Sequence, residues 1–334
     1  MKIAITCNIK EEVPPHLEEC YAEWDDHETI ESVRKALLER HEEVFIVEAN
    51  RDAPSRLNSL KPDMVFNMAE GMGGDSRESF VPAILELLEI PYTGSSPLTL
   101  GLCLNKLRAK QILSCYGIPT PRYFVVEKRY SGIEGGLEFP MIVKPLHEGS
   151  SKGIRNDSLV HGEAELEERV NSLIATYGQP ALVEEYLSGR EFTVALLGNG
   201  DDIRVLPIVE IDYSAIPRGA NPIYSYEAKW VFDRPEAPLN IFRCPAEVSD
   251  TLKENVSRLA VESFKALGVR DWCRVDIRCD AEGRPHVLEL NPLPGILPDP
   301  EHNSCFPKAA RAAGLTFSEL VNTVVDIARK RYGL

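Results

Sequence analysis

The amino-acid sequence predicts an α/β protein with a parallel sheet in its N-terminal part and an α+β arrangement in its C-terminal part. Over the first ninety-odd residues, short apolar runs alternate with helical patterns. This alternation is typical of parallel strands joined by helices that cover the faces of a sheet. Nearer the C-terminus, several strands come first and long helices follow. A chain of 334 residues is too long for one simple core and fits two or three compact units.

The N-terminal elements follow from apolar spacing and helix caps. Thr29 to Arg40 carries its apolar side chains on one helical face, and the acidic residues at its start favour a helix N-terminus. The predicted elements are, in order, the strand Ile3–Cys7, the helix Thr29–Arg40, the strands Val44–Val47 and Met64–Phe66, and a helix that includes Ala83–Leu88.

The middle of the chain contains a glycine-bearing turn at residues 148–153, which directly follows a buried strand. A small-residue segment, expected to be a loop, precedes a helix that begins at Lys106. That helix ends where glycine and proline residues stop it. The predicted elements are the helix Lys106–Tyr116, the strands Tyr123–Val126 and Phe139–Lys144, the helix Glu163–Ala175 and the strand Ala181–Glu185.

The C-terminal part contains a long polar segment, Tyr213 to Asp233, that is too broken for a core element. Long loops in compact enzymes are often lids, so we expect a lid here. The predicted elements are the strands Glu191–Leu197 and Val205–Ile211, the helix Ser249–Leu267, the strands Arg274–Cys279 and His286–Leu290, and the helix Thr316–Arg331.

Composition and charge narrow the class of protein. The net charge of −15 argues against a nucleic-acid partner, because phosphate binding needs a basic face, and an acidic surface is its simplest interpretation. No run approaches the roughly 18 apolar residues of a membrane span, and the first residues form a strand rather than a signal peptide. The eight cysteines lack zinc-site spacing. We therefore expect a cytoplasmic protein with reduced thiols and no membrane contact.

Two acidic side chains interrupt apolar strands near the C-terminus. Asp276 and Glu289 lie on strands joined by a short turn, and Asn291 ends the second strand. Two carboxylates and an amide oxygen suit Mg²⁺, which takes few protein ligands together with substrate phosphates. The alternative is a surface strand pair whose acids face water. The residues alone leave both interpretations open.

Two lysines favour the metal-and-phosphate interpretation. Lys106 opens a helix, and Lys144 ends an apolar strand just before the glycine turn, where it is placed to meet a phosphate. The turn at residues 148–153 adds backbone amides and hydroxyls, although most such turns are only turns. It does not match the Walker A pattern, and the Gly71–Gly74 run lacks a Rossmann fingerprint.

From about Phe66 onward, the chain resembles the ATP-grasp superfamily and, within it, the D-alanine–D-alanine ligase family. The order and spacing of several motifs carry this resemblance. The matching segments are Pro91-Tyr92-Thr93-Gly94-Ser95, Asn105-Lys106, Ile142-Val143-Lys144-Pro145, Glu148-Gly149-Ser150-Ser151, Leu182 to Val194, Tyr226-Glu227-Ala228-Lys229, Cys244-Pro245-Ala246, Arg274-Val275-Asp276 and Glu289 to Gly295.

The resemblance implies a three-domain ATP-grasp fold and an ATP-dependent carboxylate–amine ligase that acts through an acyl-phosphate. The domains would be an N-terminal substrate domain at 1–97, a central subdomain at 98–187 and a C-terminal subdomain at 188–334, with the lid at about 213–233. The cofactors would be ATP and two Mg²⁺ ions, which Mn²⁺ could replace. The partners would be small amino acids, with a homodimer formed through the N-terminal region. Cell-wall peptidoglycan synthesis would be the setting.

The resemblance also assigns roles to individual residues. The residues that would contact the phosphates are Lys106, Lys144, Ser150, Ser151 and, from the lid, Lys229. The adenine pocket would be lined by Glu184, Glu185 and Leu187, with Glu191 accepting from the ribose hydroxyls. Asp276, Glu289 and Asn291 would hold the metal ions. Arg274 and the Gly295 amide would stabilise the oxyanion of the second step, and Ser304 would help hold the second substrate's carboxylate.

The amino-acid end departs from the family pattern. The family's Gly-Gly-x-Ser-x-Glu motif after the first strand, whose glutamate meets the first substrate's ammonium, is missing. Asp25, Asp26 and Glu28 are candidates to replace it, although helix capping explains them equally well. Glu70 stands where the family has a histidine, and Trp230 stands where it has a lid tyrosine, so Trp230 offers no hydroxyl to tie the lid.

Two alternatives to D-alanine ligation follow from these departures. One is an amino-acid or dipeptide ligase of secondary metabolism with other substrates. The other is a nucleotide-binding regulator that has lost catalysis. The retained Arg274 counts against a regulator, because an ATP sensor has no need for an oxyanion residue.

Overall fold

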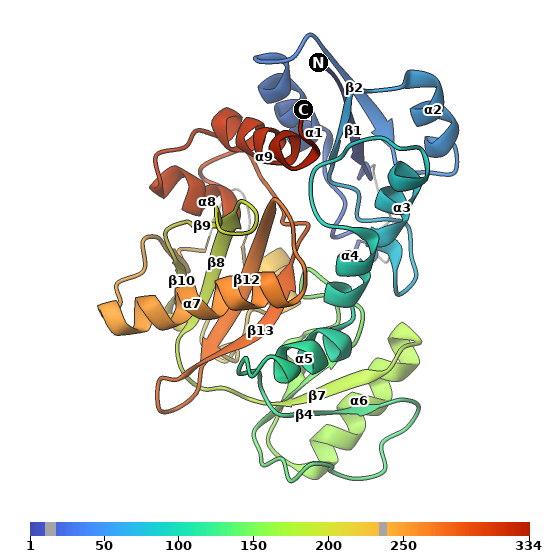
Figure 1. The fold of residues 1–334 in the computed structure, drawn as a ribbon. Coiled ribbons are helices and arrows are strands. Elements are labelled where there is room, and N and C mark those ends of the chain that lie inside the picture. The colour runs from blue at the N-terminus through green and yellow to red at the C-terminus, as the bar shows by residue number, and fades with distance from the viewer. Residues whose placement is uncertain (11–17, 234–238) are drawn as a thin grey trace.

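The computed structural model describes residues 1–10, 18–233 and 239–334, and within these ranges the strands pair into three sheets (Figure 1). The N-terminal sheet is parallel, whereas the other two are antiparallel. The predicted α/β class, with an α+β C-terminal part, is confirmed.

The N-terminal sheet has the order β2-β1-β3, and helices connect its strands. Asp26 caps helix α1, because its Oδ1 accepts a hydrogen bond of 2.7 Å from the Thr29 amide. The elements are β1 (Lys2–Cys7), α1 (His27–Leu38), β2 (Glu43–Glu48), α2 (Ala53–Leu60), β3 (Met64–Asn67), the short 3-10 helix η2 (Arg77–Ser79) and α3 (Phe80–Leu87). Helix α2 was not predicted, since only eight mostly polar residues form it.

The central sheet has the order β4-β7-β5-β6, and α6 packs against it. In the β5–β7 register, Ile142 lies opposite Glu184. Lys144 is two residues along the same strand and so shares a face with Glu184. The elements are β4 (Tyr123–Val126), β5 (Met141–Pro145), η3 (Asn156–Ser158), β6 (Leu159–Val160), α6 (Glu163–Tyr177) and β7 (Ala181–Glu185).

The C-terminal sheet has the order β11-β10-β8-β12-β13, with β9 paired to β8. The predicted strand Val205–Ile211 was wrong as a single element, because Pro207 has no amide hydrogen for a ladder and the chain forms two short strands around it. The elements are β8 (Glu191–Leu197), β9 (Arg204–Val205), β10 (Val209–Ile211), η4 (Tyr213–Ala215), β11 (Phe242–Arg243), α7 (Asp250–Ala266), β12 (Trp272–Cys279) and β13 (Pro285–Asn291).

Two helices link the N-terminal sheet to the rest, α4 (Pro97–Leu104) and α5 (Lys106–Cys115). The segment before Lys106 was predicted to be a loop, but it is helical because Ser96 caps it and Pro97 occupies its first position. Ala109 and Leu113 share a core with Val275 and Leu290 of the C-terminal sheet. Helices α4 and α5 therefore pack on the C-terminal sheet. Each of the three sheets lies within a single predicted domain range, and the division into domains stays a prediction.

The last two helices, α8 (Cys305–Ala312) and α9 (Phe317–Tyr332), pack against the N-terminal part. One hydrophobic core includes Ile5 and Val33 together with Leu320 and Val324. Figure 1 shows the two chain ends at the same end of the molecule, with α9 near α1. None of the described helices is long and apolar enough to cross a membrane. All eight cysteines are free thiols.

A fully buried carboxylate, Asp271, ties three parts of the chain together. Its oxygens accept hydrogen bonds of 3.0 and 2.7 Å from Arg331 of α9, and one of 2.8 Å from the Gly94 amide. Asn199 donates a further bond of 2.8 Å. Because a buried charge is tolerated only when paired and hydrogen-bonded, this cluster fixes the C-terminal helix against the chain that leaves the N-terminal sheet.

We predict that Asp271→Ala lowers the free energy of unfolding by about 3–5 kcal/mol, because it leaves the Arg331 guanidinium without its buried partner. Urea denaturation followed by circular dichroism measures this change. Asp202→Ala is the matched control. Asp202 pairs at the surface with Lys330, which lies on α9 as Arg331 does, so this substitution should have little effect. Equal effects of the two substitutions would contradict the structural role given to Asp271.

Candidate active site

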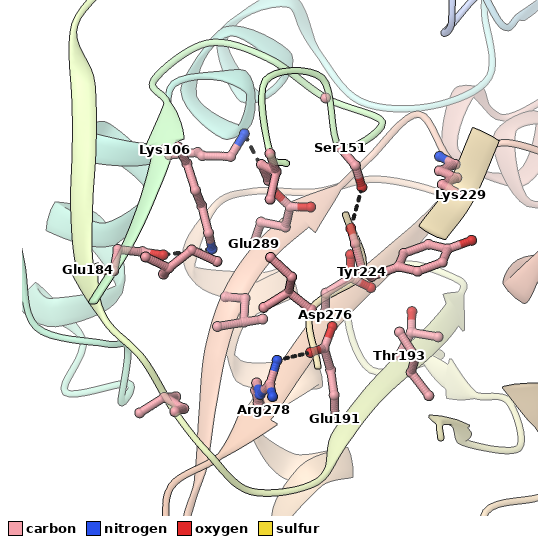
Figure 2. Close-up of a pocket in the computed structure, with 18 of the residues that line it drawn as sticks. Lys106, Ser151, Glu184, Glu191, Thr193, Tyr224, Lys229, Asp276, Arg278 and Glu289 are labelled. Carbon is pink, nitrogen blue, oxygen red and sulfur yellow. Dashed lines mark hydrogen bonds and ion pairs between the residues drawn. The ribbon is translucent and has the colours of Figure 1, made fainter. Parts of the chain in front are cut away.

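Two adjoining cavities lie where the three sheets meet. The first lies between the central and C-terminal sheets, and Figure 2 shows the labelled side chains of both sheets pointing toward its interior. The second lies between the N-terminal part and the C-terminal sheet, and encloses about 230 Å³. Both cavities are lined by Lys106, Glu148, Gly149, Ser150, Lys229, Arg274 and Glu289.

A buried glutamate between two lysines closes one end of the first cavity. Glu184 of β7 is 1 % exposed and lies 2.5 Å from the Lys110 ammonium and 2.7 Å from that of Lys144. Burial by itself would raise the pKa of Glu184, but the two ammonium groups lower it to about 2. Glu184 therefore stays ionised and holds the Lys144 ammonium in a fixed position beside the cavity.

A second charged cluster lies at the opposite wall of the first cavity. Arg278 of β12 donates a hydrogen bond of 2.8 Å to Glu191 of β8, and the Tyr213 hydroxyl donates another of 2.8 Å (Figure 2). The Arg278 guanidinium also stacks near the Tyr186 and Tyr213 rings. These contacts fix the Glu191 carboxylate at the cavity wall.

The β12–β13 pairing gathers the residues predicted to bind metal. Asp276 lies opposite Glu289, and Arg274 lies opposite Asn291. Asp276 accepts two hydrogen bonds from Arg274, of 3.0 and 2.9 Å, and one of 3.0 Å from the Asn291 side chain. Lys106 lies 3.4 Å from Glu289. The three predicted ligands are therefore neighbours, as the sequence indicated.

The glycine turn at residues 148–153 lies beneath the lid. Ser150 and Ser151 have φ values of +50° and +60°, which turn the backbone sharply at this point. The Ser151 hydroxyl donates a hydrogen bond of 2.8 Å to the Tyr224 carbonyl, and the Lys229 ammonium donates one of 3.2 Å to the Ser150 hydroxyl. The segment predicted to be a lid thus lies directly against this turn.

The lid differs from the expected loop in one respect. Residues Glu227–Phe232 form a π-helical turn, which places Lys229 at the cavity. The Trp230 indole donates a hydrogen bond of 3.2 Å to the Ser150 carbonyl. Trp230 has no hydroxyl, but its indole N–H supplies a donor that contacts the glycine turn. Burial lowers the pKa of Lys229 to about 8, with Arg274 adding to the shift.

The second cavity has a backbone wall and an acidic wall. On the first, the Ser304 hydroxyl donates a hydrogen bond of 3.2 Å to the Gly295 carbonyl and accepts one of 3.2 Å from the Leu297 amide. The acidic wall belongs to the N-terminal part and is formed by Asp25, Asp26, Glu70 and Glu78.

Three carboxylates of the acidic wall have no hydrogen-bond or ion-pair partner in the described part of the chain. They are Asp25, Glu70 and Glu78, and Glu78 is only 8 % exposed. Burial raises the pKa of Asp25 to about 7, with Asp26 adding to the shift. Burial also raises the pKa of Glu78 to about 7, and that of Glu70 rises well above its ordinary value. The folded protein thus keeps proton-binding carboxyl groups at this wall.

Comparisons with known proteins match this arrangement. Residues 112–326 match the family model described as D-ala D-ala ligase C-terminus. The chain is 36 % identical over 302 residues to D-alanine–D-alanine ligase B of Pseudomonas syringae pv. tomato, which covers 88 % of this chain and 85 % of that protein. The chain therefore belongs to the D-alanine–D-alanine ligase family. It is an ATP-dependent ligase that forms a carbon–nitrogen bond.

One further relative and one solved structure are similar to the chain over most of its length. The chain is 37 % identical over 317 residues to the uncharacterized protein y4sG of Sinorhizobium fredii, which covers 92 % of this chain and 90 % of that protein. A crystal structure of the D-alanine–D-alanine ligase of Bacillus anthracis with ATP superposes with a TM-score of 0.73 at 23 % identity, over 100 % of this chain and 99 % of that one. The predicted ATP-grasp fold of the ligase is confirmed.

The structure places most of the predicted ligase site residues at the two cavities. Glu185 and Leu187 line the first cavity with Glu184, and Trp230 and Ser304 line the second. Asp26 lines the second cavity and also caps α1. Glu28 is exposed in the first turn of α1 and is not brought to either cavity. The individual roles of these residues stay predictions.

Sequence reasoning missed several charged residues of the ligase site. Lys110 lies one helical turn after Lys106 on a face that also buries Ala109, and this spacing was a usable signal. The sequence contained no such signal for Arg278, because the role of Arg278 depends on which strand pairs with β12. The other missed residues form an ion-pair cluster. Glu23 lies 2.9 Å from Arg77 and 2.7 Å from Lys152. Lys152 also lies 2.7 Å from Glu148.

The unpaired Glu78 carboxylate predicts a pH-dependent loss of stability in this ligase. Its raised pKa means that the folded protein keeps a proton that the unfolded chain releases, so the free energy of unfolding falls as pH rises from about 4.5 to about 7. Glu78→Gln removes the charge. Its melting temperature should exceed that of the unsubstituted ligase by a few degrees at pH 8 and by less at pH 5.5. Calorimetry that finds the variant no more stable at pH 8 would contradict this prediction.

Proposed function

We propose that this ligase joins the carboxylate of one amino acid to the amine of a second through an acyl-phosphate. The observation that carries the proposal is the meeting of two cavities at a shared wall that contains Lys106, Lys229, Arg274 and Glu289. A nucleotide in the first cavity and an amino acid in the second would bring a γ-phosphate and a carboxylate together at this wall.

In the first step, a carboxylate oxygen of the first amino acid attacks the γ-phosphorus of ATP, the bond to the β-phosphate oxygen breaks, and ADP leaves. Lys106, Lys144 and Lys229 are the cations placed to hold the phosphate charges. Glu184 orients Lys144 through their 2.7 Å ion pair. A phosphate near Lys229 would favour its ammonium form and so reverse the effect of burial on its pKa.

In the second step, the neutral amine of the second amino acid attacks the acyl carbon and the bond to the phosphate oxygen breaks. The amine gives up one proton, which the departing phosphate can accept, and inorganic phosphate leaves. Arg274 and the Gly295 amide are the donors proposed to stabilise the oxyanion. The closed lid excludes water, which would otherwise hydrolyse the acyl-phosphate. The hydrogen bond from Trp230 to the Ser150 carbonyl supports this closure.

We also propose that Asp276, Glu289 and Asn291 hold Mg²⁺. Their oxygen atoms lie on paired strands and fit a hard cation that completes its coordination with phosphate and water. Bound there, Mg²⁺ or Mn²⁺ would neutralise phosphate charge during the transfer. Within the described ranges, no three His, Cys, Asp or Glu side chains gather as a metal site, which agrees with a set of two carboxylates and one amide. Two ions are proposed, as the family resemblance implies.

D-Alanine is the first substrate to test, because the curated relative from Pseudomonas carries that name. The acidic wall favours testing other amino acids as well. A nucleotide-binding regulator is not supported, because Arg274, Asp276 and Asn291 form a hydrogen-bonded cluster at the cavity wall. Since ATP is a substrate, we place the enzyme in the cytoplasm.

Release of ADP, measured with Mg²⁺ and D- or L-amino acids singly and in pairs, together with product masses, tests the proposed reaction. We expect a dipeptide whose mass equals the two amino acids minus water. Asp276→Ala with Glu289→Ala should lower kcat by on the order of a hundredfold or more, because the phosphate charges lose their metal ions. Undiminished turnover of this double variant would refute the metal assignment.

We further propose a homodimer through the N-terminal part. An apolar surface, here called the α3 patch, supports it, because Phe80, Leu87 and Leu98 are 50 %, 82 % and 72 % exposed. Exposed large apolar side chains that lie together often mark an interface between subunits. The family resemblance places a dimer in the same region.

We predict that Leu87→Glu with Leu98→Glu yields a monomer, because two charges would have to be buried in the interface. Light scattering after gel filtration measures the mass. The matched control is Ile133→Glu, which replaces a 37 % exposed apolar side chain between β4 and β5, outside the α3 patch. If the unsubstituted protein is already a monomer at micromolar concentration, the dimer proposal fails.

A further inference from the structure

The acidic wall of the second cavity contains more negative charge than the surrounding protein neutralises. Glu78 is more than nine-tenths buried, lines the cavity, and has no hydrogen-bond or ion-pair partner among the residues that the structure describes. Asp25 and Glu70 line the same cavity and are equally unpaired within those ranges. An isolated buried carboxylate is costly. A buried Glu78 together with the half-buried Asp25 and Glu70 on one cavity wall indicates that a ligand supplies cations there.

The other charged groups around this cavity are already paired. Glu23 and Glu148 are held by Arg77 and Lys152. Likewise, Glu289 pairs with Lys106, and Arg274 pairs with Asp276. None of their cations makes an ion pair with the acidic wall. Arg77, Lys106 and Lys152 act on Glu78 only from a greater distance, and burial still raises the pKa of its carboxyl group.

Two lysines that line the cavity are engaged elsewhere. The Lys10 ammonium lies 5.5 Å from the centre of the Trp230 ring, and the Lys229 ammonium donates to the Ser150 hydroxyl. Lys229 is also one of the residues proposed to hold the γ-phosphate. Among the described side chains, no cation therefore forms an ion pair with Asp25, Glu70 or Glu78.

The α-ammonium group of one amino acid brings a single positive charge and can pair with only part of this wall. We propose that the amino acid bound against the acidic wall has a cationic side chain, so that it brings a second positive charge to Asp25, Glu70 and Glu78. The substrate class is that of ornithine, lysine and arginine. This inference rests on the proposed ligase function and specifies one of its two substrates.

The protonation behaviour of the wall agrees with this substrate class. Burial, with repulsion from neighbouring carboxylates, raises the pKa values of Asp25, Glu70 and Glu78, so the free protein keeps protons where a cation would bind. A neutral side chain would leave these carboxyl groups either protonated or unpaired. A cationic side chain would replace the protons and form charge-assisted hydrogen bonds with the ionised carboxylates.

The experiment compares cationic amino acids with neutral analogues of the same shape. ADP release is measured with ornithine against norleucine and with arginine against citrulline, in both chiralities, each alone and paired with D- or L-alanine. We expect kcat/KM to be at least tenfold higher for the cationic member of a pair. Ornithine and arginine also separate an ammonium from a guanidinium as the preferred cation.

Substitutions then locate the preference. Glu70→Gln and Glu78→Gln should each reduce the cationic-to-neutral ratio of kcat/KM at least fivefold, mainly through KM for the cationic substrate. The matched control, Glu43→Gln, removes an exposed carboxylate of β2 outside both cavities and should leave the ratio unchanged. The melting temperature of each variant confirms that it folds.

Binding without turnover gives an independent measurement. Calorimetric titration of ornithine and norleucine into the ligase with Mg²⁺ and a non-hydrolysable ATP analogue should give at least tenfold tighter binding of ornithine. Equal affinities together with equal kcat/KM values would overturn the cationic-substrate inference. If alanine then still drives dipeptide formation, the proposed ligase function stands. If no amino acid elicits ADP release, both proposals fail.

Discussion

The register between β12 and β13 is the constraint on which the rest of the site depends. It sets Asp276 opposite Glu289 and Arg274 opposite Asn291. Both carboxylates therefore line the first cavity, and Arg274 lines both cavities. The register shifts just beyond Asp276, where Leu288 is the extra residue, and this returns Val287 to the core. A slip of one residue would turn the acids into the core and expose apolar side chains.

The two cavities differ in how their charges are balanced. The acidic side chains that line the first cavity have cations within hydrogen-bonding distance. Examples are Glu184 with Lys144 and Glu191 with Arg278. Around the second, Asp25, Glu70 and Glu78 lack such cations within the described residues. In the proposed assignment, the first cavity would receive the nucleotide on side chains already fixed by ion pairs, whereas the cationic substrate would supply the ion-pair partners that the second cavity lacks.

Sequence reasoning identified features that depend on residues next to one another in the chain. It missed features that depend on contacts between distant segments. Lys144 and its following turn could be predicted because strand and loop are contiguous. The break at Pro207 and the helix before Lys106 were missed because each is short and depends on one proline or one cap. The tie from Trp230 to Ser150 was missed because it joins residues eighty positions apart.

The sequence by itself determined the α/β class, the ATP-grasp motifs and the candidate residues of the proposed nucleotide and metal sites, because these depend on short segments of fixed composition and spacing. Only the tertiary structure decided that Lys110 holds Glu184, that Glu23 joins Arg77 to Lys152, and that an unpaired acidic wall faces the second cavity. Whether a carboxylate is capped, paired or left for a ligand depends on neighbours from distant segments. Spacing along one chain does not reveal those neighbours.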